Sequence, residues 1–216
     1  MMGHLLYNKN YIAIEIDVGG SKKGFHAVAL RSGRYLTKFA HFDAATVAAW
    51  CRETGALIVG IDAPCRWRST EQARSAERKL ATDGISCFIT PDSEKAKSRA
   101  FYQWMLNGAE LYRRIEPDYP LYNGSTFSGP VCFETFPQAV ACMLADRIVS
   151  AKQKAVERRT LLHKAGIDIS ALTNMDLVDA ALCALAAQHL MAGSIKTYGD
   201  ITDGFIVVPA DRLSEV

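Results

Sequence analysis

The amino-acid sequence predicts an α/β fold built around a mixed β-sheet, and three observations predict it. The β-branched run YIAIEIDVGG (11–20) ends in an acid and two glycines, which is typical of a buried strand entering a tight turn. Apolar runs at 24–30 and 35–42 flank the short polar segment 31–34 and predict a hairpin. A strand–helix–strand pattern follows over 43–62 and predicts parallel pairing. The first three strands are therefore expected to be antiparallel and the later ones parallel.

The first helix is predicted over 44–54. Asp43 is a favoured N-cap residue, and Gly55 stands where a helix end most often needs a left-handed backbone. The continuous apolar run LIVGID (57–62) comes next and predicts a strand that is buried on both faces.

The segment after this strand is predicted to be mostly helical. Ser69 and Gln72 have the spacing of a capping box, which predicts a helix that ends near Gly84. Apolar residues recur at helical spacing over 93–115 and predict a second, longer helix. The segment 117–130 is rich in Pro, Gly, Ser and Asn, which indicates a loop or lid.

The C-terminal part begins with VCFETF (131–136), a predicted short strand. Pro137 suits the first turn of a helix, which is expected to run to about Ile148. The remaining elements are predicted as helices over 151–165 and 175–191 and a closing strand over 205–209.

Composition indicates one ordinary globular domain. The chain has 216 residues, of which 49% are hydrophobic and 22% charged, and this excludes collagen-like and wholly disordered classes. The net charge of +2 excludes a strongly basic packaging protein, although a local basic face stays possible. With no repeat and no long linker, we expect a single domain over 1–216 with a helical and lid insertion at 66–130.

The sequence also predicts a cytoplasmic protein without a membrane segment. None of the six cysteines forms a C-x-x-C pair, and the N-terminus lacks the features of a signal peptide. The most apolar run, 180–187, is too short to span a bilayer. Reduced thiols in the cytoplasm are the simplest interpretation.

Acidic residues stand at unusual places for a charge. Asp17 and Asp62 end the first and fourth strands, and Glu134 lies within the strand 131–136. Asp179 lies on an otherwise apolar helix face, three residues after Asp176. Converging carboxylates repel one another, and a divalent cation such as Mg²⁺ or Mn²⁺ relieves the conflict. We therefore expect catalytic roles for Asp17, Asp62, Glu134 and Asp179, and metal ligation by Asp17, Asp62, Asp176 and Asp179.

Each acid also has a structural interpretation. Asp17 could shape the following glycine turn, and Asp62 could cap the loop after it. Glu134 could pair with an arginine, since buried acids are usually paired. Asp176 could be the N-cap of the last helix. Asp179 is the hardest to explain in this way, because an acid on an Ala- and Leu-rich face needs a partner.

Four basic residues are candidates for phosphate contacts: Lys22, Arg74, Arg78 and Arg158. Lys22 follows the glycine turn beside Asp17. Arg74 and Arg78 have the i, i+4 spacing that places them on one helix face, and Arg can hold a phosphate with two hydrogen bonds. The alternative is a solvated, charged helix face.

The order and spacing of several motifs resemble a known family. IEIDVGGSKKGF (14–25), VGIDAP (59–64), FETFP (133–137) and DLVDAALCALAA (176–187) together resemble the predicted ribonuclease-H-like nucleases of domain-of-unknown-function family 429. The resemblance implies a ribonuclease-H-like five-stranded sheet, with three antiparallel strands followed by two parallel ones. It also implies nuclease activity, with Asp17, Asp62, and Asp179 with Asp176, as the acids of the site. Glu134 matches the family's E-x-x-P element, and the often polar position before the proline is Phe136 here.

Three functions stay open at this stage. The first is a metal-dependent nuclease or phosphodiesterase that acts on nucleic acid or a small phosphodiester. The second is a phosphotransferase, because DVGGSKKGF (17–25) also resembles the first phosphate loop of actin-like sugar kinases. The third is a non-catalytic binding module with the same fold. The Ala-rich helices at 137–148 and 175–191 could pack on the sheet or form a homodimer face.

Overall fold

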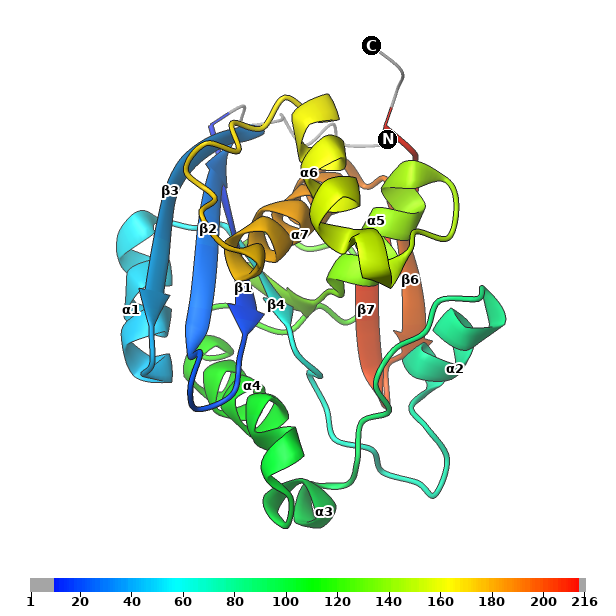
Figure 1. Cartoon of the computed structure of the whole chain (residues 1–216). Helices are drawn as coiled ribbons and strands as arrows, with labels where there is room; N and C mark the ends of the chain where they lie inside the picture. Colours follow the sequence, from blue (N-terminus) through cyan, green and yellow to red (C-terminus); the bar gives the residue numbers. More distant parts are fainter. Residues whose placement is uncertain (1–9, 214–216) are drawn as a thin grey trace, which may run out of the picture.

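The computed structural model describes residues 10–213, and at its centre lies a seven-stranded mixed sheet with helices on both faces (Figure 1). The strand order is β3-β2-β1-β4-β5-β7-β6. The N-terminal stretch from which we predicted the absence of a signal peptide lies largely outside the described residues.

The first five strands have the predicted directions. The strands β1 (Ile12–Val18), β2 (Phe25–Arg31) and β3 (Arg34–His41) form an antiparallel meander. The strand β4 (Ile58–Asp62) runs parallel to β1, and β5 (Val131–Glu134) runs parallel to β4. The mixed sheet expected from the sequence is therefore confirmed in this part.

The expected strand count was wrong, because the sheet continues past β5. The predicted C-terminal strand is β7 (Gly204–Pro209), which pairs in parallel with β5. An unpredicted edge strand, β6 (Ile195–Asp200), pairs with β7 in the antiparallel direction. Its sequence IKTYGD has too few apolar residues to show a strand pattern, and Gly199 takes a φ of 124° within it.

The helix α1 (Ala44–Thr54) confirms its predicted limits. The Asp43 carboxylate accepts a hydrogen bond from the Thr46 backbone N–H at 2.9 Å, and Gly55 ends the helix with a φ of 72°. For the long helix α7 (Met175–Ala192), one structural interpretation made Asp176 the N-cap, and this was wrong. Asn174, not Asp176, is its N-cap, and accepts from the Leu177 N–H at 2.8 Å. The Asp176 side chain is therefore not used as the cap.

Two helix limits in the 66–130 segment were wrong. The helix α2 (Ser75–Thr82) starts six residues after Ser69, since Glu77 rather than Gln72 supplies the reciprocal cap and accepts from the Arg74 N–H at 3.2 Å. The predicted helix 93–115 is broken at Arg99, whose backbone is extended. It comprises α3 (Ser93–Lys97), the 3₁₀ turn η1 (Ala100–Tyr102) and α4 (Gln103–Ile115).

The remaining helices are α5 (Pro137–Ala145), the 3₁₀ turn η2 (Ala151–Gln153) and α6 (Lys154–Lys164). The helix α5 ends three residues earlier than predicted, because Asp146 takes a left-handed backbone with a φ of 52°. These limits leave a short connection before α6.

Each face of the sheet has its own apolar core. One core packs the sheet against α1 and α4, and the other packs it against α5, α6 and α7 (Figure 1). Alternation along β1 sends Ile14 and Ile16 into the first core. Glu15 and Asp17 consequently point to the opposite face, towards α7.

Among the described residues, one helix has the length and hydropathy of a membrane span. This helix is α7, and 67% of it is buried within the fold. Its apolar composition is therefore accounted for by packing on the sheet.

Candidate functional site

The ends of three neighbouring strands bring polar side chains together. Asp17 on β1 lies in register with Asp62 on the parallel strand β4. Asp17 is also paired across the antiparallel ladder with His26 on β2. The chain leaves β1 towards β2 on one side and later returns to place β4 on the other side. Such a switch point is where open α/β sheets bind ligands.

The first two turns of α7 add two more acids above these strand ends. The predicted metal ligands Asp17, Asp62, Asp176 and Asp179 all line one open pocket of about 340 Å³, which we call the acid pocket. Lys23, Lys154 and Arg158 line the same pocket. Residues that are far apart in the sequence thus converge, as the sequence interpretation requires.

A tight turn between β1 and β2 closes one side of the acid pocket. The Gly19 N–H donates to the Gly24 carbonyl at 2.8 Å, and Gly24 has a φ of 66°. The Asn107 side chain on α4 donates to the Gly19 carbonyl at 2.8 Å and fixes the turn from the other side. A Cβ on Gly19 would come within 2.5 Å of the Lys23 Cβ, so this position requires glycine.

The two acids on α7 already have cationic partners. The Lys23 ammonium donates to Asp176 at 2.7 Å. Asp179 pairs with the buried Arg158 guanidinium, and the Lys154 Nζ lies 3.7 Å from its second oxygen. By contrast, Asp17 and Asp62 form no ion pair with any other described residue. The two strand acids are therefore the carboxyls of the pocket that lack a neutralising ion pair among the described residues.

Burial and mutual repulsion raise the pKa of both strand acids. The pKa of Asp17 rises to about 8, mainly because the carboxyl is desolvated, and then because Asp179 and Asp176 repel its charge. Desolvation also raises the pKa of Asp62 well above its usual range, with Asp17 as the next cause. The Asp17 carboxyl would therefore hold a proton near neutral pH unless a cation took its place, and burial favours the protonated form of Asp62 in the same direction.

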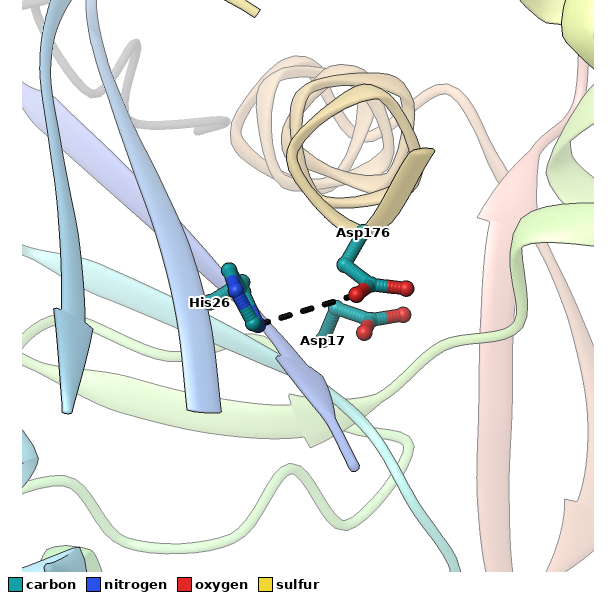
Figure 2. Close-up of side chains that lie close together, drawn as sticks. All are labelled: Asp17, His26 and Asp176. Carbon is teal, nitrogen blue, oxygen red and sulfur yellow. Dashed lines mark ion pairs between the residues drawn. The ribbon is translucent and has the colours of Figure 1, made fainter. Parts of the chain in front are cut away.

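Three side chains lie close enough together to bind one metal ion. One ligand atom each from Asp17, His26 and Asp176 lies within 4.8 Å of the other two. Figure 2 shows these side chains converging from β1, β2 and the start of α7. The buried Nδ1 of His26 has no hydrogen-bond partner within residues 10–213 and lies 3.9 Å from an Asp176 oxygen. The donor set of two carboxylates and one imidazole fits a divalent ion.

Sequence reasoning missed His26. The position was detectable, because an antiparallel hairpin that pairs Val18 with Phe25 must pair Asp17 with His26. The predicted strand 24–30 already contained the residue, and only the register was needed.

Sequence reasoning also missed Glu15, which lies fully buried beneath the acid pocket. Neither carboxylate oxygen has a hydrogen-bond partner of good geometry among the described residues. Burial raises the pKa of Glu15 well above its usual range, Asp62 and Asp17 add to the shift, and the Asp62 backbone opposes it weakly. Gly60 opposite makes room for the side chain, because a Cβ there would lie 3.2 Å from the Glu15 Cγ. The alternation of IEID, with two acids on one face, was the available signal.

Glu134 does not line the acid pocket. It is buried at the end of β5 and accepts two hydrogen bonds from the Arg74 guanidinium, at 2.8 and 2.5 Å. The Cys65 N–H donates to it as well, at 2.8 Å. Arg74, which we had expected to contact phosphate, is only 2% exposed and also donates to Glu77 at 3.0 Å. The pair matches the alternative in which Glu134 is neutralised by an arginine.

The other predicted phosphate contacts are divided between two settings. Arg158 lies in the wall of the acid pocket, where it holds Asp179 and donates to Gln138 at 3.2 Å. Lys22 and Arg78 are exposed, and neither lines the acid pocket. Lys23, the neighbour of Lys22, is the lysine of this turn that reaches the acids.

Comparison with known proteins gives one match. A family model described as "Protein of unknown function (DUF429)" matches residues 16–203, which include every residue of the acid pocket. No curated protein and no solved structure matches the chain.

Proposed function

We propose that this chain, which belongs to the DUF429 family, is a metal-dependent phosphodiesterase that acts on nucleic acid or a small phosphodiester. The observation that supports the proposal is the meeting of Asp17 and Asp62 at the switch point of the sheet, where neither forms an ion pair with another described residue. Two carboxyls in this setting are costly for a fold unless they serve a ligand.

Asp17, His26 and Asp176 would hold a divalent ion, with Asp62 next to them as a further oxygen ligand. Such an ion, when bound, polarises a phosphoryl oxygen and lowers the pKa of bound water. Mg²⁺ and Mn²⁺ both accept carboxylate ligands, and the imidazole favours Mn²⁺.

The cations of the acid pocket would complete the site. Arg158 and Lys154 hold Asp179, so this acid does not repel an incoming phosphate with its full charge. Lys23 is 61% exposed and lies at the edge beside Asp176. Its ammonium can therefore turn to a substrate phosphate once Asp176 binds the metal ion.

The direct test is hydrolysis of nucleic acids and small phosphodiesters by protein stripped with EDTA and then resupplied with Mn²⁺ or Mg²⁺. We expect cleavage only after metal is restored. Asp62→Asn should lower the rate by about 100-fold or more, because it removes a charge from the reacting centre. Asp168→Asn, at an exposed acid outside the pocket, should leave the rate unchanged. Equal loss in both variants, or metal-independent cleavage, would contradict the proposal.

Metal preference gives a second, independent prediction. His26→Ala removes the only nitrogen ligand of the cluster and keeps both carboxylates. We expect calorimetric titration of the EDTA-stripped protein to show Mn²⁺ affinity reduced about 10-fold, with Mg²⁺ affinity less affected. His163→Ala, on the exposed side of α6, is the matched control. A variant that binds both ions as the original protein does would remove His26 from the ligand set.

A further inference from the structure

A second pocket opens directly beside the acid pocket. It has a volume of about 210 Å³, and we call it the Trp104 pocket. It is lined by the ends of β4 and β5, by Ile206 in the middle of β7, by the start of α2, and by the segment 87–90. Four residues line both pockets: Val18, Asp62, Trp104 and Phe136. A single ligand can therefore occupy both pockets, with one group in the Trp104 pocket and a phosphate in the acid pocket.

Most of the residues that line the Trp104 pocket are apolar, and the charged ones are Asp62, Arg74, Glu77 and Glu134. Phe88, Trp104 and Phe136 contribute aromatic rings, and Pro64 and Ile206 add aliphatic surface. The Phe88 ring is 61% exposed and stands 6.2 Å from the Trp104 ring, inclined at 60°. Exposed aromatic rings beside a polar site are surfaces on which planar groups stack.

Two hydroxyl groups within this lining lack a partner in the part of the chain that the structure describes. Thr90 is fully buried and Thr135 is 1% exposed, and the Oγ1 of each accepts and donates no hydrogen bond there. A buried hydroxyl without a partner is unfavourable, so both groups are suited to a ligand that brings polar atoms. A hydroxyl can donate and accept, which matches the mixed edge of a heterocyclic ring.

The floor of the Trp104 pocket is held rigidly by buried charges. Glu77 accepts from the Thr90 N–H at 3.0 Å and from Arg74, which also binds Glu134. These contacts fix the segments that carry Thr90 and Thr135 relative to each other. A fixed floor with aromatic walls favours a flat ligand of one size.

We propose that the Trp104 pocket binds one nucleobase of the substrate whose phosphate is held in the acid pocket. The inference rests on the proposed function and specifies its substrate class. The volume suits a single ring system and excludes a base pair, so the base must be unpaired when it enters. The substrate is therefore a single-stranded nucleic acid, a splayed end or a short oligonucleotide.

The test compares two single-stranded DNA hexamers that carry the same phosphates, one with normal bases and one with abasic sites throughout. Binding is measured by anisotropy in Mn²⁺ with proteins that all carry Asp62→Asn, so that the candidate cluster of Asp17, His26 and Asp176 can keep its ion while cleavage is slow. We expect the normal strand to bind about 10-fold more tightly. Phe88→Ala, at an exposed ring that should not affect folding, is expected to remove most of this difference. Thr90→Val should reduce it by about threefold.

The matched control is Phe42→Ala, which removes an exposed ring that does not line the Trp104 pocket. Equal binding of the two strands, or equal effects of Phe88→Ala and Phe42→Ala, would overturn the base pocket. Metal-dependent cleavage of both strands at one rate would also overturn it and would leave the proposed function standing. Base-dependent binding without cleavage in any metal would support the pocket and contradict the proposed function.

Discussion

Replacing Asp17 with Asn is expected to abolish metal-dependent hydrolysis and, in the absence of metal, to make the protein more stable at pH 8. Both effects come from one property of the side chain. Asp17 offers a ligand atom to the candidate metal cluster, and its carboxyl is desolvated and repelled by Asp179 and Asp176. Asn keeps the shape, removes the charge and is a poorer ligand.

The sign of the pH effect follows from the direction of the pKa shift. The pKa of Asp17 is about 8 in the folded protein, against a usual value of 3.8. The folded state thus binds this proton more tightly than the unfolded state. The resulting stabilisation is fully present below the unfolded pKa and is lost as the pH rises through the folded pKa. The metal-free protein should therefore weaken progressively between about pH 4 and pH 8.

Thermal unfolding in EDTA at pH 5 and pH 8 measures this loss. We expect the free energy of unfolding to fall by about 1–2 kcal/mol between these pH values, because the Asp17 side chain is partly exposed. This corresponds to a fall of about 2–8 °C in Tm. Asp17→Asn should reduce the difference between the two pH values, and Mn²⁺ at pH 8 should restore only the original protein. Asp168 is the control, since its pKa is lowered by Ser170 and it stays ionised across this range. If the Tm of the original protein and that of Asp17→Asn changed with pH by the same amount, the prediction would be contradicted.

Local patterns indicated where two pairs of acids lie. Strand periodicity and the rule of parallel pairing through a helix place Asp17 and Asp62 at adjacent strand ends. The i, i+3 spacing of Asp176 and Asp179 places both on one side of α7. Each of these two inferences depends on a local pattern. The expectation that the two pairs meet came from the family resemblance, and the structure brings all four acids to one pocket.

The partners of these acids could not be predicted in the same way. Lys23 and Asp176 are 153 residues apart, and their ion pair depends on how α7 crosses the sheet. The same holds for Arg74 and Glu134, which are 60 residues apart and meet because α2 packs against β6 and β7, with Arg74 at its start reaching the end of β5. Spacing alone predicted that Arg74 is exposed and contacts phosphate.

The start of α2 was misplaced for a related reason. Two capping patterns, Ser69 with Gln72 and Arg74 with Glu77, lie within a few residues of each other, and tertiary contacts select the second.

Replacing Arg74 with Ala is expected to cause a large loss of stability. The guanidinium is almost fully buried and binds Glu134 through two hydrogen bonds, Glu77 through a third, and the Asp203 carbonyl through a fourth. Without it, two carboxylates are left buried with no compensating charge. Removing one partner from a buried ion pair costs about 3–5 kcal/mol. For a domain of this size the Tm should fall by about 6–20 °C.

The contrast with Arg78 separates this structural role from phosphate binding. Arg78 lies one helical turn further along α2 and is exposed, so Arg78→Ala should change the free energy of unfolding by no more than about 0.5 kcal/mol. Adding Glu134→Gln to Arg74→Ala should recover part of the lost stability, because it removes one of the unpaired charges. Chemical denaturation of the three variants measures these differences. If Arg74→Ala unfolded like Arg78→Ala and instead bound nucleic acid in a less salt-dependent way, Arg74 would be a substrate contact and not the tie between α2 and β5.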